Sequence, residues 1–281
     1  MKKDQMIPGR RAVLRIAACL GAALTTRLLT AGQAQTPGSP TPPPPSGGGQ
    51  PVSGAGAPRK PSTYRLQPMT EGAQSGYRRP APPVRKVPIL EMPELGRTMV
   101  LTFDDGPHPD YTPGILRTLR EHDVRAMFFV CGEMADAHRD LLREADDDGH
   151  IICNHTWSHP LMTALRPSQI RDEMGRTSDV VEDILGTPPL WYRAPYGAWN
   201  RYAFEIGSEM GMEPLAWTVD SLDWEMPGTD SIVRRVLDGA GPGVVVLNHD
   251  AGGDRSQSVA ALRRYLPQLL DDGYRIAVPH R

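Results

Sequence analysis

Two short segments of the chain carry side chains that can bind a metal ion and move a proton. The segment Thr102–Pro107 reads Thr-Phe-Asp-Asp-Gly-Pro and supplies two adjacent carboxylates, Asp104 and Asp105, while His155 and His159 supply two imidazoles further along. Two imidazoles and one carboxylate can hold a catalytic divalent metal and leave one coordination position open for water. The second carboxylate is then free to act as a base. These residue types therefore predict a metal-dependent hydrolase.

The spacing of the two histidines supports this prediction. His155 and His159 lie four positions apart, so on one turn of a helix both rings would share a face and bind a single ion. Asp105 is the candidate third ligand. Either motif alone is weak, because Asp-Asp-Gly commonly forms an ordinary turn and most His-x-x-x-His pairs bind no metal. Together they favour a metal site.

The elements around these residues predict a parallel sheet. From Arg97 onward, short runs typical of strands alternate with helical patterns. The predicted strands are 99–103, 125–130, 151–153, 190–193, 213–219, 243–248 and 274–278, and the predicted helices include 113–121, 139–146, 168–185, 200–210 and 259–271. This alternation indicates an α/β fold, and about seven parallel strands would close or nearly close into an irregular (β/α) barrel.

Further polar residues follow the predicted strands at their carboxyl ends. Arg193 ends the fourth strand, Asp220 and Asp223 follow the fifth, and His249 follows the sixth. In parallel α/β folds these strand ends form one rim, where catalytic residues gather. We therefore expect these side chains to meet the carboxylates and imidazoles at one mouth.

The candidate residues fall in five segments, which in chain order are Thr102–Pro107, His155–His159, Arg193–Gly197, Asp220–Trp224 and Leu247–Asp250. They resemble the five motifs of the polysaccharide deacetylases that share the NodB homology domain, carbohydrate esterase family 4. The likeness covers the region from about Arg97 to Val278, and all five motifs are intact.

The resemblance implies a role for each residue that could form the metal and base site. Asp104 would be the general base that takes a proton from the attacking water. Asp105 would join His155 and His159 as the metal ligands. Arg193 would hold Asp104 ionised and oriented.

The resemblance also implies an acid and an oxyanion donor. His249 would protonate the departing amine, for which it must be an imidazolium, and Asp223 would raise its pKa. The backbone N–H of Tyr196 would donate to the oxyanion formed in the reaction.

The implied substrate is an acetylated polysaccharide or oligosaccharide. Pro195 and Tyr196 would contact it, while Trp224 and Leu247 resemble the apolar walls that receive the acetyl methyl group. The expected reaction is hydrolysis of the N-acetyl group of N-acetylglucosamine residues in peptidoglycan or chitin-like oligomers. Zinc is the favoured ion, and cobalt or nickel would also suit these ligands.

Two other functions remain open. Acetylxylan O-acetyl esterases belong to the same family, and neither His249 nor Asp223 excludes that activity. A catalytically silent wall-binding protein would rely on the N-terminal region, although five intact motifs argue against it. A net charge of −2 over 281 residues argues against nucleic acid as the main partner, and we expect a monomer with one sizeable core.

The N-terminus predicts export. Residues 1–34 are predicted to be a signal peptide, in which the pair Arg10-Arg11 precedes an apolar run and is typical of a twin-arginine signal. Ordinary signal peptides also carry arginine pairs, and Ile16–Cys19 resembles a lipobox that would leave a lipid on Cys19. We expect a secreted or envelope-associated bacterial protein without a membrane-spanning segment after cleavage.

The rest of the chain divides at a change of composition. Residues 35–95 are rich in Pro and Gly and predict a disordered linker, and residues 96–281 form the predicted catalytic domain. Two cysteines, Cys131 and Cys153, fall in this domain. Export would permit a disulfide between them, but their apolar neighbours favour two buried thiols.

Overall fold

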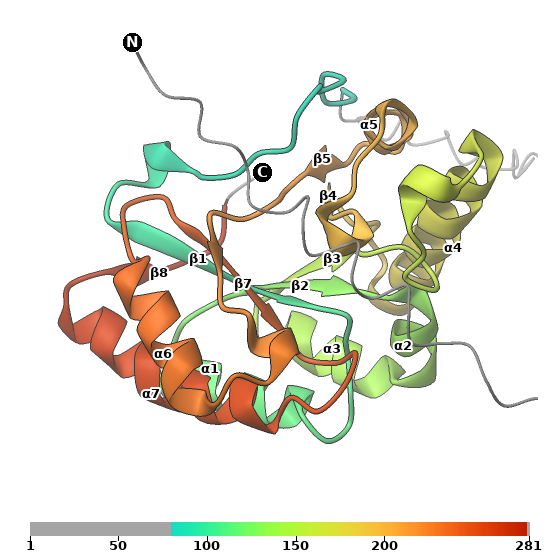
Figure 1. The fold of residues 1–281 in the computed structure, drawn as a ribbon. Helices are drawn as coiled ribbons and strands as arrows, with labels where there is room; N and C mark the ends of the chain where they lie inside the picture. The colour runs from blue at the N-terminus through green and yellow to red at the C-terminus, as the bar shows by residue number, and fades with distance from the viewer. Residues whose placement is uncertain (1–79, 280–281) are drawn as a thin grey trace, which may run out of the picture. The chain divides into compact units, whose positions relative to one another are not determined.

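The computed structural model describes residues 80–279, whose strands form one parallel sheet (Figure 1). The strand order is β5-β4-β3-β2-β1-β7-β6, and β8 pairs with the start of β1. The strands are β1 Thr98–Asp104, β2 Met127–Val130, β3 Ile151–Asn154, β4 Trp191–Tyr192, β5 Glu213–Pro214, β6 Val219–Asp220, β7 Val245–His249 and β8 Arg275–Ile276. The predicted irregular (β/α) barrel of about seven parallel strands is confirmed.

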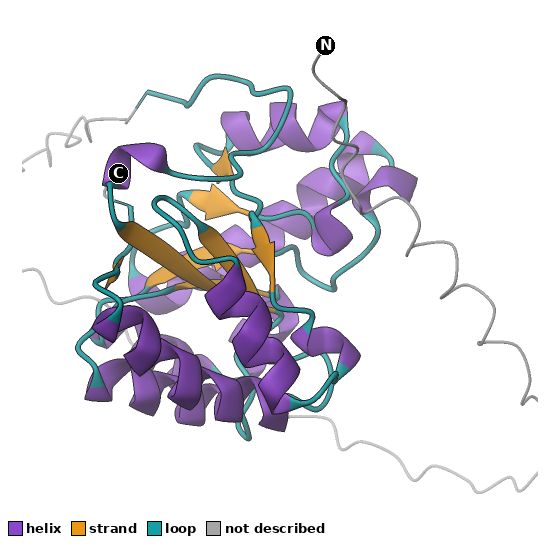
Figure 2. Cartoon of the chain, turned by 60° about the vertical axis from the view of Figure 1, so that its left-hand side comes forward, coloured by secondary structure: helices purple, strands orange, loops and turns teal. Residues whose placement is uncertain are grey.

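Helices enclose the strands, as Figure 2 shows. The α-helices are α1 Thr112–Glu121, α2 Gly132–Ala137, α3 Arg139–Asp147, α4 Pro167–Leu185, α5 Arg201–Glu209, α6 Thr229–Asp238 and α7 Ser256–Asp271. Helix α7 packs against both α1 and α6, and Figure 1 shows these three along one face of the sheet. The described 3-10 helices are η3 Pro93–Leu95, η4 Met162–Ala164, η5 Pro195–Gly197 and η6 Asp223–Glu225.

The central strand β1 explains where the core lies. All seven of its residues are buried, as expected for a parallel strand covered on both faces. Met99, Leu101 and Phe103 join the cluster between the sheet and the helices, whereas Val100 joins a second cluster with Phe129 on the opposite face. The period of two residues along the strand thus separates an outer core from an inner one.

The helices and strands differ from the predicted ones in two ways. The run expected as one strand over 213–219 forms β5 and β6, because the carbonyls of Leu215 and Ala216 accept hydrogen bonds from the Arg193 side chain at 3.0 and 2.8 Å. Helices α2 and α6 were not predicted. In α6 the buried residues are Ile232, Val233 and Val236, which is the narrow apolar stripe of a short surface helix.

The folded region begins before the predicted boundary at residue 96. Met92 is buried, and its N–H donates to the Gly243 carbonyl at 2.8 Å. Ile89 donates to Pro214 and accepts from Ala216, so this segment pairs beside β5. Part of the predicted linker therefore packs on the domain. The predicted signal peptide, Cys19 and the remaining linker lie outside the described residues.

Two smaller predictions concern the cysteines and the membrane. Cys131 and Cys153 are both free and buried, which agrees with the favoured thiol interpretation, and burial raises the pKa of each. Among residues 80–279, no helix combines the length and the apolar character that crossing a bilayer requires.

The packing of the N-terminal segment makes a stability prediction. We expect Met92→Ala to lower the free energy of unfolding by about 3 kcal/mol and Tm by roughly 6–12 °C, because it leaves a cavity in the inner core. The matched control is Val87→Ala, since Val87 is 70% exposed and its loss should shift Tm by at most about 2 °C. Equal Tm values for the two variants in differential scanning calorimetry would contradict this packing.

Candidate active site

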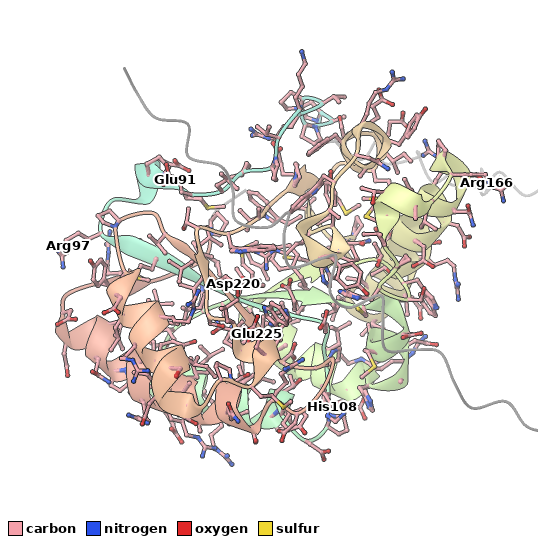
Figure 3. The ribbon with its side chains drawn as sticks, in the orientation of Figure 1. Glu91, Arg97, His108, Arg166, Asp220 and Glu225 are labelled. Carbon is pink, nitrogen blue, oxygen red and sulfur yellow. The ribbon has the colours of Figure 1, made fainter. Side chains whose placement is uncertain are left out.

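The carboxyl ends of the strands bring the predicted residues to one rim. In the sheet register Asp104 at the end of β1 pairs with His249 at the end of β7 and with Phe129 of β2. Neighbouring strands lie about 4.8 Å apart, so the predicted base and the predicted acid start from adjacent backbone positions. Figure 3 labels Asp220 and Glu225, which flank the Asp223 position along the chain, near the middle of the view.

Three side chains form a group with the composition of a metal site. The donor atoms of Asp105, His155 and His159 all lie within 4.8 Å of one another. The Oδ1 atom of Asp105 lies 3.4 Å from Nε2 of His155 and 3.3 Å from Nε2 of His159. The structure therefore brings together the three residues that were predicted to be metal ligands.

The spacing of His155 and His159 predicted that both lie on one helical turn. The structure differs, because this segment forms no helix. His155 follows β3, and the chain then makes an irregular turn with positive φ at Thr156 (68°) and at His159 (58°). Left-handed backbone at non-glycine residues costs about 1–3 kcal/mol each and persists where surrounding contacts enforce it. The turn is therefore held by its neighbours rather than by helical hydrogen bonds.

Hydrogen bonding fixes the orientation of the first imidazole. Nδ1 of His155 lies 2.8 Å from the backbone carbonyl of Arg193. A carbonyl only accepts, so Nδ1 carries a proton, and Nε2 is the ring nitrogen that faces Asp105. This orientation is the one that a metal ligand needs.

The electrostatics of the group also fit a cation. Oδ1 of Asp105 is buried and has no hydrogen-bond partner in the described structure. Burial would raise the pKa of Asp105, but the adjacent His155, with His249 and His159, brings it well below its usual range. Burial and His155 lower the pKa of His159, which favours the neutral imidazole. An unpaired buried carboxylate oxygen beside two imidazoles matches the donor set of a divalent metal.

Asp104 does not belong to this three-residue group, because its side chain is bound to Arg193. Its Oδ1 accepts a hydrogen bond from Arg193 Nη1 at 2.6 Å, and both side chains are almost fully buried. The same Nη1 donates to the hydroxyl of Thr102 at 2.9 Å. This ion pair fixes the orientation of the Asp104 carboxylate beside the three-residue group.

His249 is held by a different carboxylate. Nδ1 of His249 lies 2.7 Å from Oδ1 of Asp223, whose Oδ2 accepts from the His249 N–H and the Ser258 hydroxyl. Burial would lower the pKa of His249, but the charge of Asp223 and its hydrogen bond raise it to about 9. The same contacts lower the pKa of Asp223 despite its burial. The imidazolium is therefore the dominant form of His249 at neutral pH.

The predicted substrate-binding residues take up different positions. Tyr196 is 61% exposed, packs edge-on against His159, and has φ of 60°. Its backbone N–H has no acceptor among the residues that the structure describes. Pro195 and Leu247 are buried, and Trp224 is half-buried in η6. Tyr196 is the member of this group that faces solvent beside the candidate metal site.

Sequence reasoning assigned no role to Asp250 or Ser258. Asp250 is buried and accepts hydrogen bonds from the Gly106 N–H at 3.1 Å and the Thr112 hydroxyl at 2.6 Å. A Cβ atom at residue 106 would lie 2.1 Å from this carboxylate, which explains the glycine. Asp250 therefore anchors the turn that presents Asp104 and Asp105. The sequence feature that could have identified Asp250 was its position directly after His249.

Comparison with known proteins agrees with this arrangement. The family model described as polysaccharide deacetylase matches residues 92–215. The chain is 35% identical over 189 residues to a chitooligosaccharide deacetylase of Azorhizobium caulinodans, covering 63% of this chain and 90% of that protein.

Solved structures that resemble this fold include the following two. One is a peptidoglycan N-acetylglucosamine deacetylase in complex with 4-naphthalen-1-yl-N-oxidanyl-benzamide, with a TM-score of 0.65, 33% identity, and coverage of 67% of this chain and 89% of that chain. The other is a wild-type CE4 family pseudoenzyme of Bacillus anthracis, with a TM-score of 0.64, 28% identity, and coverage of 69% and 67%.

The geometry of the three-residue group predicts which variants lose metal. We expect Asp105→Ala and His155→Ala to retain less than about a tenth of the zinc bound by the wild type after dialysis, because each removes one of three protein ligands. Zinc would be counted by inductively coupled plasma mass spectrometry. The control is His108→Ala, since His108 stacks on Tyr111 outside the group and should keep full metal content. Full zinc content in either ligand variant would refute the assignment.

Proposed function

Because the chain belongs to the polysaccharide deacetylase family, we propose that it is an exported, metal-dependent hydrolase that removes the acetyl group from N-acetylglucosamine units of peptidoglycan or chitin-like oligosaccharides. The observation that carries the proposal is the presence of two separate ion pairs at one rim. Arg193 is paired with Asp104, and Asp223 is paired with His249. Amide hydrolysis needs a base and an acid on the same substrate.

The first half of the reaction uses Asp104. A divalent metal held by Asp105, His155 and His159 would, when bound, lower the pKa of the attacking water and polarise the acetyl carbonyl. Asp104 takes the proton as the water oxygen bonds to the carbonyl carbon. The Tyr196 N–H, which has no acceptor within the described residues, is available to donate to the oxyanion.

The second half uses His249. The amine nitrogen is a poor leaving group unless it is protonated, so His249 gives it a proton as the C–N bond breaks. Acetate and the free sugar amine are then released. Asp104 gives its proton to the solvent and His249 takes one up from the solvent, which restores both residues. An alkoxide is a better leaving group than an amine anion and depends less on protonation. The presence of a cationic acid therefore favours N-acetyl over O-acetyl substrates.

Other parts of the proposal rest on the sequence and on the chemistry of the ligands. Two imidazoles and one carboxylate suit zinc, with cobalt or nickel as substitutes. The signal-like residues 1–34 support export to the cell envelope or beyond it. We also propose that the protein acts as a monomer.

The direct test is a substrate panel. Acetate release would be measured from chitooligosaccharides, peptidoglycan and acetylxylan with purified protein and added zinc, using an enzyme-coupled acetate assay. We expect release from at least one of the two N-acetyl substrates, at a higher kcat/KM than from acetylxylan. Release from acetylxylan alone would make the protein an O-acetyl esterase, and no release from any substrate would support a silent family member.

The His249–Asp223 pair predicts a pH profile. The raised pKa means that His249 stays protonated at neutral pH and that activity falls as pH rises through about 9. In Asp223→Asn the stabilising charge is gone while burial remains, so the basic limb of kcat/KM should move down by about two units or more. His249→Ala is the control, because it should bind metal normally yet turn over negligibly. An unmoved limb in Asp223→Asn, or normal turnover in His249→Ala, would refute this acid.

A further inference from the structure

A carboxylate outside the rim holds the turn between the two histidine ligands. Oε2 of Glu173, on α4, accepts hydrogen bonds from the backbone N–H groups of Trp157 at 2.9 Å and Ser158 at 2.8 Å. Oε1 of Glu173 accepts from the Ser158 hydroxyl at 2.9 Å. We infer that Glu173 is a positioning residue that sets the spacing of His155 and His159 and thereby the metal affinity, an inference that rests on the metal site of the proposed function.

The turn depends on such outside partners because it belongs to no helix or strand ladder. Of the four N–H groups of residues 155–158, the first two are bound elsewhere, since His155 donates to Val130 and Thr156 donates to the side chain of Asn154. Glu173 accepts the other two. Loss of Glu173 would leave two adjacent N–H groups without their acceptor, at the point where the backbone approaches His159.

Helix α4 contacts the turn at several further points. Asn154 donates from Nδ2 to the Met174 carbonyl at 2.7 Å and to Ser178 at 3.1 Å. Arg176 stacks over the Trp157 ring at 3.9 Å. Figure 1 shows α4 close to α2, and the two helices pack together. Residues of a single helix therefore hold the residue before the ligand turn and residues inside it.

Helix α2 also holds the turn. The N–H groups of Gly132 and Glu133 donate to the carbonyls of Thr156 and Trp157. A Cβ atom at residue 132 would lie 2.4 Å from the Trp157 ring, so the turn fits closely there. With α2 fixing the carbonyls and Glu173 fixing the N–H groups, a shift of the Glu173 contact would move His159 relative to His155.

Glu173 acts through the backbone and is not itself a ligand. Both of its oxygens are engaged in the three hydrogen bonds described above, and the metal-site group contains only Asp105, His155 and His159. Residues that orient ligands in this indirect way typically change metal affinity by about 10–100-fold when they are removed.

The test is a zinc titration of the metal-free full chain against a chromophoric chelator. We expect Glu173→Ala to bind zinc about 10–100-fold more weakly than the wild type. Glu173→Gln should stay within about threefold, because Oε1 can accept both N–H groups while Nε2 donates to the Ser158 hydroxyl. Asp172→Asn is the matched control, since it removes one negative charge from an exposed neighbour on α4 and should bind as the wild type does.

A second variant and a spectrum separate positioning from general damage. Glu173→Asp keeps the charge but withdraws the carboxylate by one methylene, so its zinc affinity should fall even if Glu173→Ala does not fold. The visible absorption spectrum of the cobalt-loaded protein should differ from that of the wild type in Glu173→Asp and match it in Glu173→Gln.

Two results would overturn the inference in different ways. Wild-type zinc affinity and an unchanged cobalt spectrum in Glu173→Asp and Glu173→Ala would remove the positioning role and leave the proposed function intact. Failure of the wild-type chain itself to bind zinc or cobalt would remove the proposed metal-dependent function together with the role of Glu173.

Discussion

The buried guanidinium of Arg193 is the constraint around which the rim is organised. A charge with no solvent access must be matched by acceptors, and this one donates to the Asp104 carboxylate, the Thr102 hydroxyl and the carbonyls of Leu215 and Ala216. The backbone carbonyl of Arg193 also accepts a hydrogen bond from Nδ1 of His155. One residue therefore ties together the ends of β1, β3 and β4 and the segment after β5, and it places Asp104, the proposed base, beside the proposed ligand group.

The same need to match buried charges separates the roles of the acidic residues. Asp104 faces a permanent cation, Asp223 faces His249, and Asp105 faces imidazoles that a metal requires in the neutral form. Carboxylates placed close together would normally raise the pKa of one another. Here each carboxylate has a distinct partner, so that the proposed base, acid partner and ligand can coexist on neighbouring strand ends.

Much of this arrangement was predictable from the sequence. Asp104, Asp105, His155, His159, Arg193, Asp223 and His249 all reach one rim, because parallel strands must place their carboxyl ends on the same side. The β5–β6 break was not predictable, since it depends on carbonyls that bind a side chain from β4. The early start of the packed region and the anchors Asp250 and Glu173 were missed for a similar reason. Their partners are backbone groups of distant segments, which no local pattern reveals.

The positions of the ligands are the central claim, and the zinc K-edge X-ray absorption spectrum of the zinc-loaded protein tests it most directly. The account predicts a first shell of nitrogen and oxygen atoms at about 2.0–2.1 Å, with the outer-shell scattering of two imidazole rings. A sulfur shell at about 2.3 Å, which would implicate the nearby thiol of Cys131, or the scattering of fewer than two imidazoles would contradict it.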